Sequence, residues 1–292
     1  MPTGGASPIA VVALDIDGTL LRSDRTVSPR TTAALHALVE QGTRLVLVTG
    51  RRYPAARRVA ALFGASPPFV LHNGALVIDE GAVLHREFLP LRTAREVIRL
   101  AEDQHPVAHV GPQGEGLVLV REGASRTLGA YTLDPSHPDV RVVPDLAAAL
   151  HEDPVQVMFG GAIHQIEELE SRLSGAFPGK VRLEKTLYPA LGLGLLDVLH
   201  PQVSKARALG LLLERWNLGW EQTLGIGDNW NDRAFLERVG LGFVMGNAAP
   251  GLLELGFPVL PTNDDDGVAV ALEKHVLSRR AVTPFGGKNK EG

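Results

Sequence analysis

The sequence contains no cysteine. This absence excludes disulfide bonds, thiolate zinc sites and thiol-based catalysis, and it is compatible with a reducing compartment. No apolar run reaches the roughly 18 residues that a membrane-spanning helix needs. Residues 1–8 lack the basic start and the apolar core of a signal peptide. We therefore expect a cytoplasmic protein without a membrane partner.

The sequence also lacks an excess of basic residues. Its formal net charge is −4 over 292 residues, whereas nucleic-acid-binding domains carry a basic surface, so we expect no nucleic-acid partner. Hydrophobic residues make up 45% and charged residues 21% of the chain, which is typical of a globular protein. The length is more than one compact domain usually needs and predicts two domains.

Two phosphate-binding patterns are missing as well. The chain has no GxxxxGK[ST] motif, which argues against a P-loop kinase. The glycine-rich stretches at residues 192–196 and 225–230 each lack a third glycine, and neither follows the first predicted strand. A dinucleotide-binding oxidoreductase is therefore disfavoured.

The most informative stretch is residues 9–20, IAVVALDIDGTL. Its first six residues predict a strand that is buried on both faces, as the central strand of a parallel sheet is. Asp15 and Asp17 follow at the end of this strand, and their spacing places both side chains on one side of an extended chain. Gly18 allows the backbone to turn sharply behind them. Two carboxylates at the carboxyl end of a strand lie where open α/β sheets bind ligands.

Buried strands and amphipathic helices alternate on both sides of a central insert. Strands are predicted at residues 9–14, 43–50, 68–74, 195–201, 223–228 and 241–247, with helices between them. This order predicts the fold class α/β, with a Rossmann-like doubly wound parallel sheet as the core. We expect that core to comprise residues 1–78 and 196–292.

Residues 79–195 have a different pattern and predict an inserted α+β cap domain. A hairpin is expected around residues 75–88, with its turn at 79–81. Further elements are expected as helices at residues 91–103, 145–151 and 163–173, and as strands at 117–120, 155–159 and 181–183.

The polar residues at the ends of the core strands suit phosphoryl transfer. This reaction needs a nucleophile, an acid/base and groups that hold and neutralise the phosphate. Asp15 would attack phosphorus to give an aspartyl-phosphate, and Asp17 would act as general acid and then general base. Thr49 would hydrogen-bond a phosphate oxygen, and Lys205 would hold the phosphate by its charge.

A metal site is predicted next to the nucleophile. Asp228 and Asp232 are four residues apart, so a helix that starts between them would place both near one face. Together with Asp15 they offer only carboxylate oxygens. Such ligands suit a hard cation that keeps several waters, Mg²⁺ before Ca²⁺.

These motifs resemble those of the haloacid dehalogenase superfamily of phosphatases, and within it the Cof-type members with a large α/β cap. The matching stretches are DIDGTL (15–20), VTGR (48–51), HNGA (72–75), VSK (203–205), GDNWND (227–232), VMGNA (244–248) and TNDDDGV (262–268). They occur in the family's order and span the core. The resemblance implies that the Asp17 backbone carbonyl also binds the metal and that Asp228 is its main carboxylate. It implies a small phosphorylated metabolite as substrate: a sugar phosphate, a nucleotide or a phosphorylated cofactor such as pyridoxal phosphate or flavin mononucleotide.

Several assignments stay open at this level. Gly50, Asn73 and Asn231 are candidate substrate or phosphate ligands, although a turn or helix-start role suits the last two equally. In the cap, His109, Arg121 and Arg126 are candidate substrate-recognition residues, and the acidic run at residues 264–266 is interpreted as helix capping. A phosphomutase or phosphotransferase, or a non-catalytic metabolite-binding regulator, remains an alternative function. The oligomeric state is not predicted.

Overall fold

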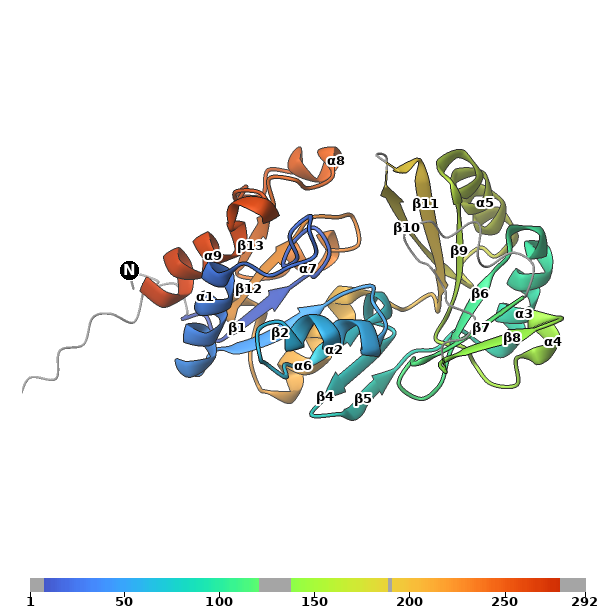
Figure 1. Ribbon diagram of the computed structural model, residues 1–292, viewed down its shortest axis with the longest axis horizontal. Helices are drawn as coiled ribbons and strands as arrows, with labels where there is room; N and C mark the ends of the chain where they lie inside the picture. The colour runs from blue at the N-terminus through green and yellow to red at the C-terminus, as the bar shows by residue number, and fades with distance from the viewer. Residues whose placement is uncertain (1–7, 121–137, 189–190, 279–292) are drawn as a thin grey trace, which may run out of the picture. The chain divides into compact units, whose positions relative to one another are not determined.

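A computed structural model describes residues 8–120, 138–188 and 191–278 (Figure 1). The cap candidates Arg121 and Arg126 lie outside these ranges. The chain divides into two compact units. The first unit comprises residues 1–46, 62–65 and 218–292, and the second comprises residues 47–61 and 66–217. The domain boundaries expected from the sequence differ from this division and stay a prediction.

The first unit contains parallel strands covered by helices. β1 (Val11–Leu14) pairs parallel with β12 (Thr223–Gly227), which pairs parallel with β13 (Leu241–Val244). Every residue of β1 and β12 is buried, as the sequence predicts for central parallel strands. The shorter elements of this unit are η4 (Trp220–Gln222), α7 (Arg233–Leu236), α8 (Pro250–Leu253), η5 (Asn263–Asp265) and η6 (Glu273–Leu277).

Helices from opposite ends of the sequence lie side by side in this unit. α1 (Pro29–Glu40) begins at the N-cap Ser28, whose hydroxyl accepts from the Thr31 N–H, as expected for a Ser-Pro helix start. It packs against α9 (Gly267–Leu272) (Figure 1). An ion pair between Arg30 and Glu273 adds to this contact.

Strand β2 (Arg44–Val48) runs through both units. At its start, the Arg44 N–H donates to the Ala10 carbonyl. At its end, Leu47 and Val48 pair parallel with β3 (Phe69–Leu71). The second unit continues with α2 (Tyr53–Ala61), η1 (His72–Gly74) and the antiparallel pair β4 (Leu76–Asp79) and β5 (Ala82–Arg86), which confirms the predicted hairpin. It also contains α6 (Lys205–Arg215).

The second unit also holds a six-stranded sheet with the order β10-β11-β9-β6-β7-β8. Its strands are β6 (Val107–Val110), β7 (Gly116–Val120), β8 (Val140–Val143), β9 (Gln156–Ala162), β10 (Arg182–Tyr188) and β11 (Leu193–Leu199). All neighbours are antiparallel except β7 and β8. This mainly antiparallel sheet and the helices between its strands form the α+β region that the sequence predicts.

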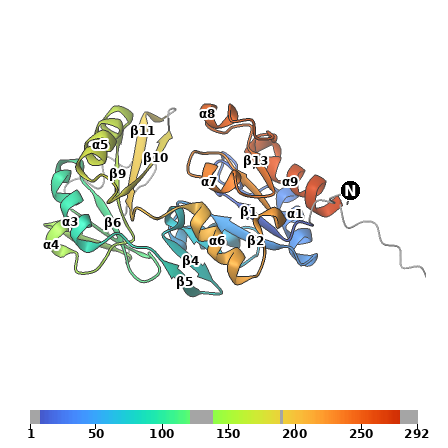
Figure 2. The same ribbon diagram turned by 180° about the vertical axis from the view of Figure 1, so that it is seen from behind.

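Helices cover one face of this sheet. They are α3 (Leu91–Leu100), α4 (Leu146–Ala149) and α5 (Ile163–Ala176), with the short η2 (Glu102–Gln104) following α3 (Figure 2). Their apolar residues pack on Ala108, Val157, Phe159 and Val198. Alternate residues of the same strands point to the opposite face, where Val107, Met158 and Leu195 form a separate apolar cluster. That opposite face also carries polar residues, which the next section describes.

One strand prediction is wrong. The apolar run at residues 195–201 was expected to resume the parallel sheet, but it belongs to β11, which pairs antiparallel with β9 and β10. A central strand is buried on both faces in either kind of sheet, so its composition does not distinguish them. β6 and β8 were not predicted from the sequence. Among the described residues, no helix combines the length and the apolar character needed to cross a membrane.

Candidate active site

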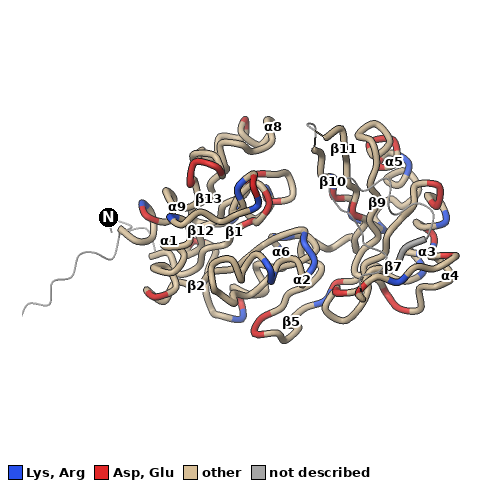
Figure 3. The backbone as a smooth tube through the Cα atoms, viewed as in Figure 1, with Lys and Arg blue, Asp and Glu red and all other residues tan. Residues whose placement is uncertain are grey.

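Three carboxylates meet in the first unit, where neighbouring parallel strands end. Asp15 follows β1 and Asp228 follows β12, so the pairing of these strands brings the two residues together. Asp15, Asp228 and Asp232 each offer a carboxylate oxygen, and these oxygens all lie within 4.8 Å of one another. Acidic positions are visible around the labels β1 and β13 in Figure 3. The structure therefore brings together the three side chains that the sequence predicts as metal ligands.

Asp232 reaches the cluster through a turn. Its Oδ2 accepts hydrogen bonds from the N–H groups of Asp228 (3.0 Å) and Asn229 (3.1 Å). α7 begins only at Arg233, so the expected helix start between the two aspartates is wrong, although their proximity is correct. Gly227 is required here, because a Cβ at this position would lie 2.6 Å from the Asp232 side chain. Asp232 thus orients the loop that carries Asp228.

The orientation of Asp228 depends on the loop after β1. The Thr19 hydroxyl donates to Asp228 Oδ1 at 3.1 Å. Gly18 has φ +75°, and a Cβ there would lie 2.2 Å from Asp228 Oδ2. The glycine is therefore needed for both its backbone conformation and its lack of a side chain. Sequence reasoning assigned no role to Thr19, although it belongs to the quoted DIDGTL motif.

Asn247, which follows β13, and Asn263, at the start of η5, hold the same loop. The Asn247 amide donates to the Gly18 carbonyl at 2.8 Å, and its oxygen accepts from the Asn263 N–H at 2.9 Å. The Asn263 amide in turn donates to the Leu21 carbonyl at 2.8 Å. These contacts explain why strand ends far apart in the sequence carry polar residues.

Asp266 is the N-cap residue of α9 but makes no side-chain capping hydrogen bond, so the acidic run at residues 264–266 does not cap this helix as predicted. Instead, Asp264 accepts from the Ser23 N–H at 2.9 Å. None of the three residues belongs to the carboxylate cluster. Within this run, Asp264 therefore holds the segment around Ser23.

The donor set fits a hard divalent cation. All three groups are carboxylates; Asp15 and Asp232 are buried, and Asp228 is partly buried. Like charges this close repel one another strongly when they are removed from water, and a bound cation would remove that repulsion. Oxygen donors select Mg²⁺ or Ca²⁺ over softer metals.

Asp17 differs from the three clustered aspartates. Its side chain is exposed, and the residue forms an isolated bridge with Leu21 that closes the turn after β1. Asn231 lies in the turn between Asp228 and Asp232 and is partly buried. Both residues belong to the first unit, together with the carboxylate cluster.

The remaining predicted residues come together in the second unit. The Asn73 N–H donates to the Thr49 carbonyl at 3.1 Å, and the Thr49 hydroxyl accepts from the Arg51 N–H at 3.1 Å. A Cβ on Gly50 would lie 3.1 Å from Asn73 Oδ1. Thr49, Gly50 and Asn73 therefore form one group at the end of β2 and in η1.

Lys205 lies next to this group because the backbones of η1 and the start of α6 pack closely. It is the first residue of α6, whose N-cap Ser204 accepts from the Arg207 N–H, and it is only 1% exposed. A Cβ on Gly74 would lie 2.3 Å from the Ser204 carbonyl oxygen and 3.0 Å from the Lys205 nitrogen. The absent side chain of Gly74 thus lets η1 contact the start of α6.

A polar network not predicted from the sequence adjoins Asn73. Asp197 Oδ1 accepts from the Gln156 amide at 2.8 Å, and Asp197 Oδ2 accepts from the Asn73 amide at 3.4 Å. The Gln156 oxygen lies 3.0 Å from His72 Nδ1. Burial raises the pKa of Asp197 to about 7, with a further contribution from the charge of Glu184. Sequence reasoning missed Gln156 and Asp197 because both lie in strands identified by their apolar residues.

Two buried histidines extend this network. Burial lowers the pKa of His72 to about 4 and, together with the charge effect of His72, lowers the pKa of His109 well below its usual value. Their rings pack edge to face, with centroids 5.2 Å apart. His109 is 6% exposed. Its interpretation as a substrate-recognition residue stays a prediction.

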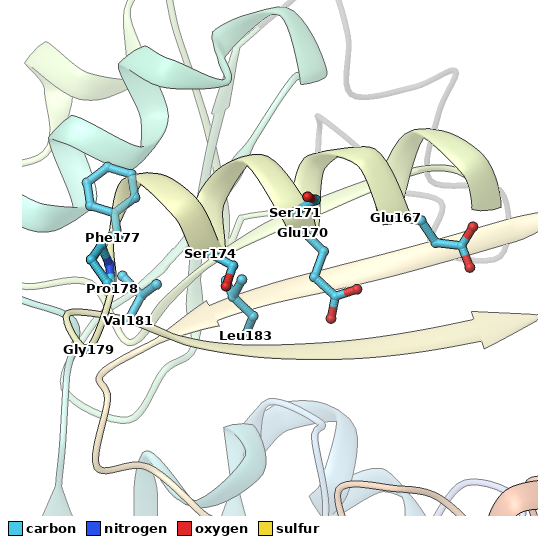
Figure 4. A pocket seen from close by; sticks show the side chains of 9 residues that line it. All are labelled: Glu167, Glu170, Ser171, Ser174, Phe177, Pro178, Gly179, Val181 and Leu183. Atoms are coloured by element: carbon cyan, nitrogen blue, oxygen red, sulfur yellow. The ribbon is translucent and has the colours of Figure 1, made fainter.

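A separate hollow of about 390 Å³ lies between α5 and the start of β10 (Figure 4). Its lining includes Glu167 and Glu170 from α5, Phe177 and Pro178 from the following turn, and Leu183 from β10. It contains none of the predicted site residues. Two carboxylates in the lining disfavour an anionic phosphorylated ligand.

Comparison with known proteins gives consistent results. The family model described as haloacid dehalogenase-like hydrolase matches residues 12–272. An HMP-PP phosphatase of Serratia proteamaculans is 31% identical over 84% of this chain and 86% of its own. The pyridoxal phosphate phosphatase YbhA of Escherichia coli is 29% identical over 91% of this chain and 98% of its own. Among solved structures, TM0651 of Thermotoga maritima is 26% identical and has a TM-score of 0.76 over 91% of this chain and 97% of its own.

Proposed function

The chain belongs to the haloacid dehalogenase-like hydrolase family, and we propose that it is a Mg²⁺-dependent phosphatase that hydrolyses a small phosphorylated metabolite through an aspartyl-phosphate on Asp15. The observation that carries this proposal is the cluster of Asp15, Asp228 and Asp232 at the ends of β1 and β12. A buried nucleophilic carboxylate needs a cation to approach an anionic phosphate, and this cluster contains both the nucleophile and the ligands for a cation.

In the first step, a carboxylate oxygen of Asp15 attacks phosphorus, and the bond from phosphorus to the ester oxygen breaks. Asp17 donates its proton to the leaving oxygen, which departs as an alcohol. The exposed position of Asp17 gives this side chain freedom to reach a leaving group. The product is an aspartyl-phosphate on Asp15.

In the second step, water attacks the phosphorus atom while Asp17 accepts a proton from it. The bond between phosphorus and the Asp15 oxygen breaks, so that inorganic phosphate leaves and the carboxylate is restored. Bound Mg²⁺ would neutralise negative charge on the phosphate oxygens during both steps. Asp15, Asp228 and the Asp17 carbonyl would hold it. Asp232 would contribute through the loop that it orients or as a further ligand.

We assign the phosphate-holding role to the group in the second unit. Thr49 and Asn73 are hydrogen-bonded neighbours, and the buried Lys205 begins the helix that contacts η1. A lysine would neutralise one phosphate charge, whereas the Thr49 hydroxyl, the Asn73 amide and the Gly50 backbone would fix orientation. Asn231 is assigned to the same role from the first unit.

The substrate class is proposed from the relatives. Two of them are named for HMP-PP and for pyridoxal phosphate, so we assign a phosphorylated cofactor or cofactor precursor as the first class to test. We further propose that residues 79–195 form the inserted cap that selects the substrate. Cytoplasmic localisation is proposed from the absence of cysteine.

The test is phosphate release from a panel of phosphorylated cofactors, sugar phosphates, nucleotides and one aryl phosphate. Each is assayed with Mg²⁺, with chelator, and with the variant Asp15→Asn. Glu254→Gln, which removes an exposed carboxylate of the same unit, serves as the matched control. We expect release that needs the metal and Asp15 but not Glu254. A wild-type protein inert on the whole panel would favour the phosphomutase or regulator alternatives, and a fully active Asp15→Asn variant would refute the assigned nucleophile.

A further inference from the structure

The buried network beside Asn73 has a defined direction of hydrogen bonding. Asp197, as a carboxylate, offers only acceptors. The Gln156 and Asn73 amides must therefore turn their NH₂ groups toward it, as the 2.8 Å and 3.4 Å contacts record. The Gln156 oxygen then faces His72, which is neutral and donates from Nδ1 across 3.0 Å. The acceptor character of Asp197 thus determines the orientation of both amides.

These residues connect separate elements of the second unit. Asp197 lies on β11 and Gln156 on β9, whereas His72 and Asn73 belong to η1. His72 and Asn73 both have positive φ, 48° and 57°, a backbone conformation that needs support from its surroundings for residues other than glycine. The network supplies such support at the point where Asn73 adjoins Thr49 and Gly50.

We propose that Asp197 is a positioning residue for the phosphate site: its carboxylate holds the Asn73 carboxamide in the orientation that meets the substrate. This inference rests on the proposed function, because it takes Asn73 as a substrate ligand. Asp197 acts through Asn73 and does not itself contact substrate. The hydrogen bonds of Asp197 to Gln156 and Asn73 thus give this residue a role besides its place in β11.

A carboxylate is needed at position 197 because both of its oxygens accept a hydrogen bond from an amide NH₂ group. Asp197→Asn keeps the size of the side chain but replaces one acceptor oxygen with an NH₂ donor. That donor would face the NH₂ group of either Asn73 or Gln156, and two donors repel. Rotation of the Asn73 carboxamide by half a turn relieves this conflict. The rotation exchanges the positions of its oxygen and its NH₂ group, so the substrate would meet the wrong one.

Protonation of Asp197 has a related effect. A proton on Oδ2 would leave no acceptor for the Asn73 amide. Burial and the charge of Glu184 place the pKa of Asp197 at about 7, so this loss occurs near neutral pH. Glu184 is the cross-strand partner of Asp197 on β10 and is itself paired with Arg182. Among the described residues, the charged and titratable groups around Asp197 are Glu184 and Arg182 from β10 and, beyond Gln156, His72 from η1. His72 in turn lies near His109 of β6 and Arg52.

The experiment measures kcat and KM from pH 5.5 to 8.5 for the best panel substrate. In the wild type, KM rises as pH falls below about 7, beyond the change that the titration of the substrate phosphate causes in every variant. Asp197→Asn is expected to raise KM about tenfold at pH 8, the size of one lost hydrogen bond, and to remove the extra pH dependence. Glu184→Gln is the directional control, because loss of its charge lowers the pKa of Asp197 and moves the transition to lower pH.

A double-mutant cycle tests whether Asp197 acts through Asn73. In an Asn73→Ala background, Asp197→Asn is expected to have no further effect on KM. Additive effects of the two substitutions, or an unmoved transition in Glu184→Gln, would overturn the proposal. If the wild type releases no phosphate, the proposed function fails. The titration of Asp197 can then still be followed through the pH dependence of the melting temperature of wild type, Asp197→Asn and Glu184→Gln. Identical melting profiles in all three would then overturn the assignment on their own.

Discussion

Acidic side chains that are buried or partly buried have different surroundings in the two units. In the first unit, carboxylate oxygens of Asp15, Asp228 and Asp232 lie within 4.8 Å of one another. Asp232 accepts a hydrogen bond from a backbone N–H and Asp228 accepts one from a hydroxyl. In the second unit, the Asp197 side chain faces two neutral amides and a like-charged cross-strand neighbour. Clustered carboxylates repel one another and suit a bound cation, whereas burial raises the pKa of the single carboxylate of Asp197. The difference separates a metal site from a titratable structural group.

The largest effect is expected from breaking the cluster itself. Asp15→Asn should lower phosphate release by on the order of 10³-fold or more, because it removes the nucleophile. The same change should raise the melting temperature in chelator, since it relieves repulsion among the three carboxylates. Phosphate-release assays and thermal unfolding of the same preparations measure both. A variant that loses both activity and stability would contradict the charge argument.

Added Mg²⁺ should stabilise the folded protein only when the carboxylate cluster of the first unit is intact. At about 100 times its dissociation constant, a ligand that binds only the folded state stabilises it by about 2.7 kcal/mol. We expect this shift in wild type and in Asp197→Asn, and its loss in Asp228→Asn. Thermal unfolding with and without Mg²⁺ checks the prediction. A shift that persists in Asp228→Asn would place the binding site elsewhere.

A smaller effect follows from the glycine behind the cluster. Gly18→Ala would put a Cβ 2.2 Å from Asp228 Oδ2 at φ +75°, so Asp228 must move and the response to Mg²⁺ should weaken. The matched control is Gly64→Ala, which has φ +67° but no atom within 4 Å of the added Cβ. Both should lose about 1 kcal/mol through backbone strain. Only Gly18→Ala should bind Mg²⁺ more weakly than the wild type, which titration calorimetry with Mg²⁺ measures.

The smallest effect is the pH dependence of stability in the second unit. The pKa of Asp197 is raised from 3.8 to about 7, so the folded state binds more protons between these values and stability falls as pH rises. The pKa of His72 is lowered from 6.5 to about 4, so between these values the unfolded state binds more protons and stability rises with pH. The two contributions oppose each other from about pH 4 to 6.5 in the wild type.

In Asp197→Asn, the contribution of Asp197 to the pH dependence of stability is removed and that of His72 remains. We therefore expect its melting temperature to rise more steeply than that of wild type between pH 4.5 and 6.5, and not to fall between pH 6.5 and 7. Glu152→Gln, an exposed carboxylate of the same unit, should follow the wild-type profile. Parallel profiles for all three proteins would show that Asp197 does not titrate in this range.

The sequence allowed the parallel core and the carboxylate cluster to be predicted because both depend on local patterns. The strand before Asp15 and the turn at Gly18 are encoded within a few residues, and parallel pairing then brings Asp228 beside Asp15. The role of Asp232 was harder to predict, because its hydrogen bonds to the 228–229 backbone depend on a turn rather than on helical spacing. β11 was assigned to the wrong sheet because burial on both faces is common to central strands of any sheet.

The network of Asp197, Gln156 and His72 was not predicted for a different reason. Each residue is a single polar position in a segment otherwise defined by its apolar residues or its glycine. Their association depends on the antiparallel register of β9 and β11 and on where η1 packs against them. Such register is a tertiary property, and one sequence carries no local signal for it.

The pairing of β1 with β12 also constrains the order in which the protein can assemble. Thr19 and the Asp228 that it contacts are 209 residues apart in sequence, so the first strand leaves the ribosome long before its partner is made. Contacts of such high sequence separation form slowly, and domains tend to fold as units during synthesis. The whole second unit is encoded between the two strands. We therefore expect that unit to fold first on the ribosome, while the edge of β1 that pairs with β12 stays open until β12 has been made.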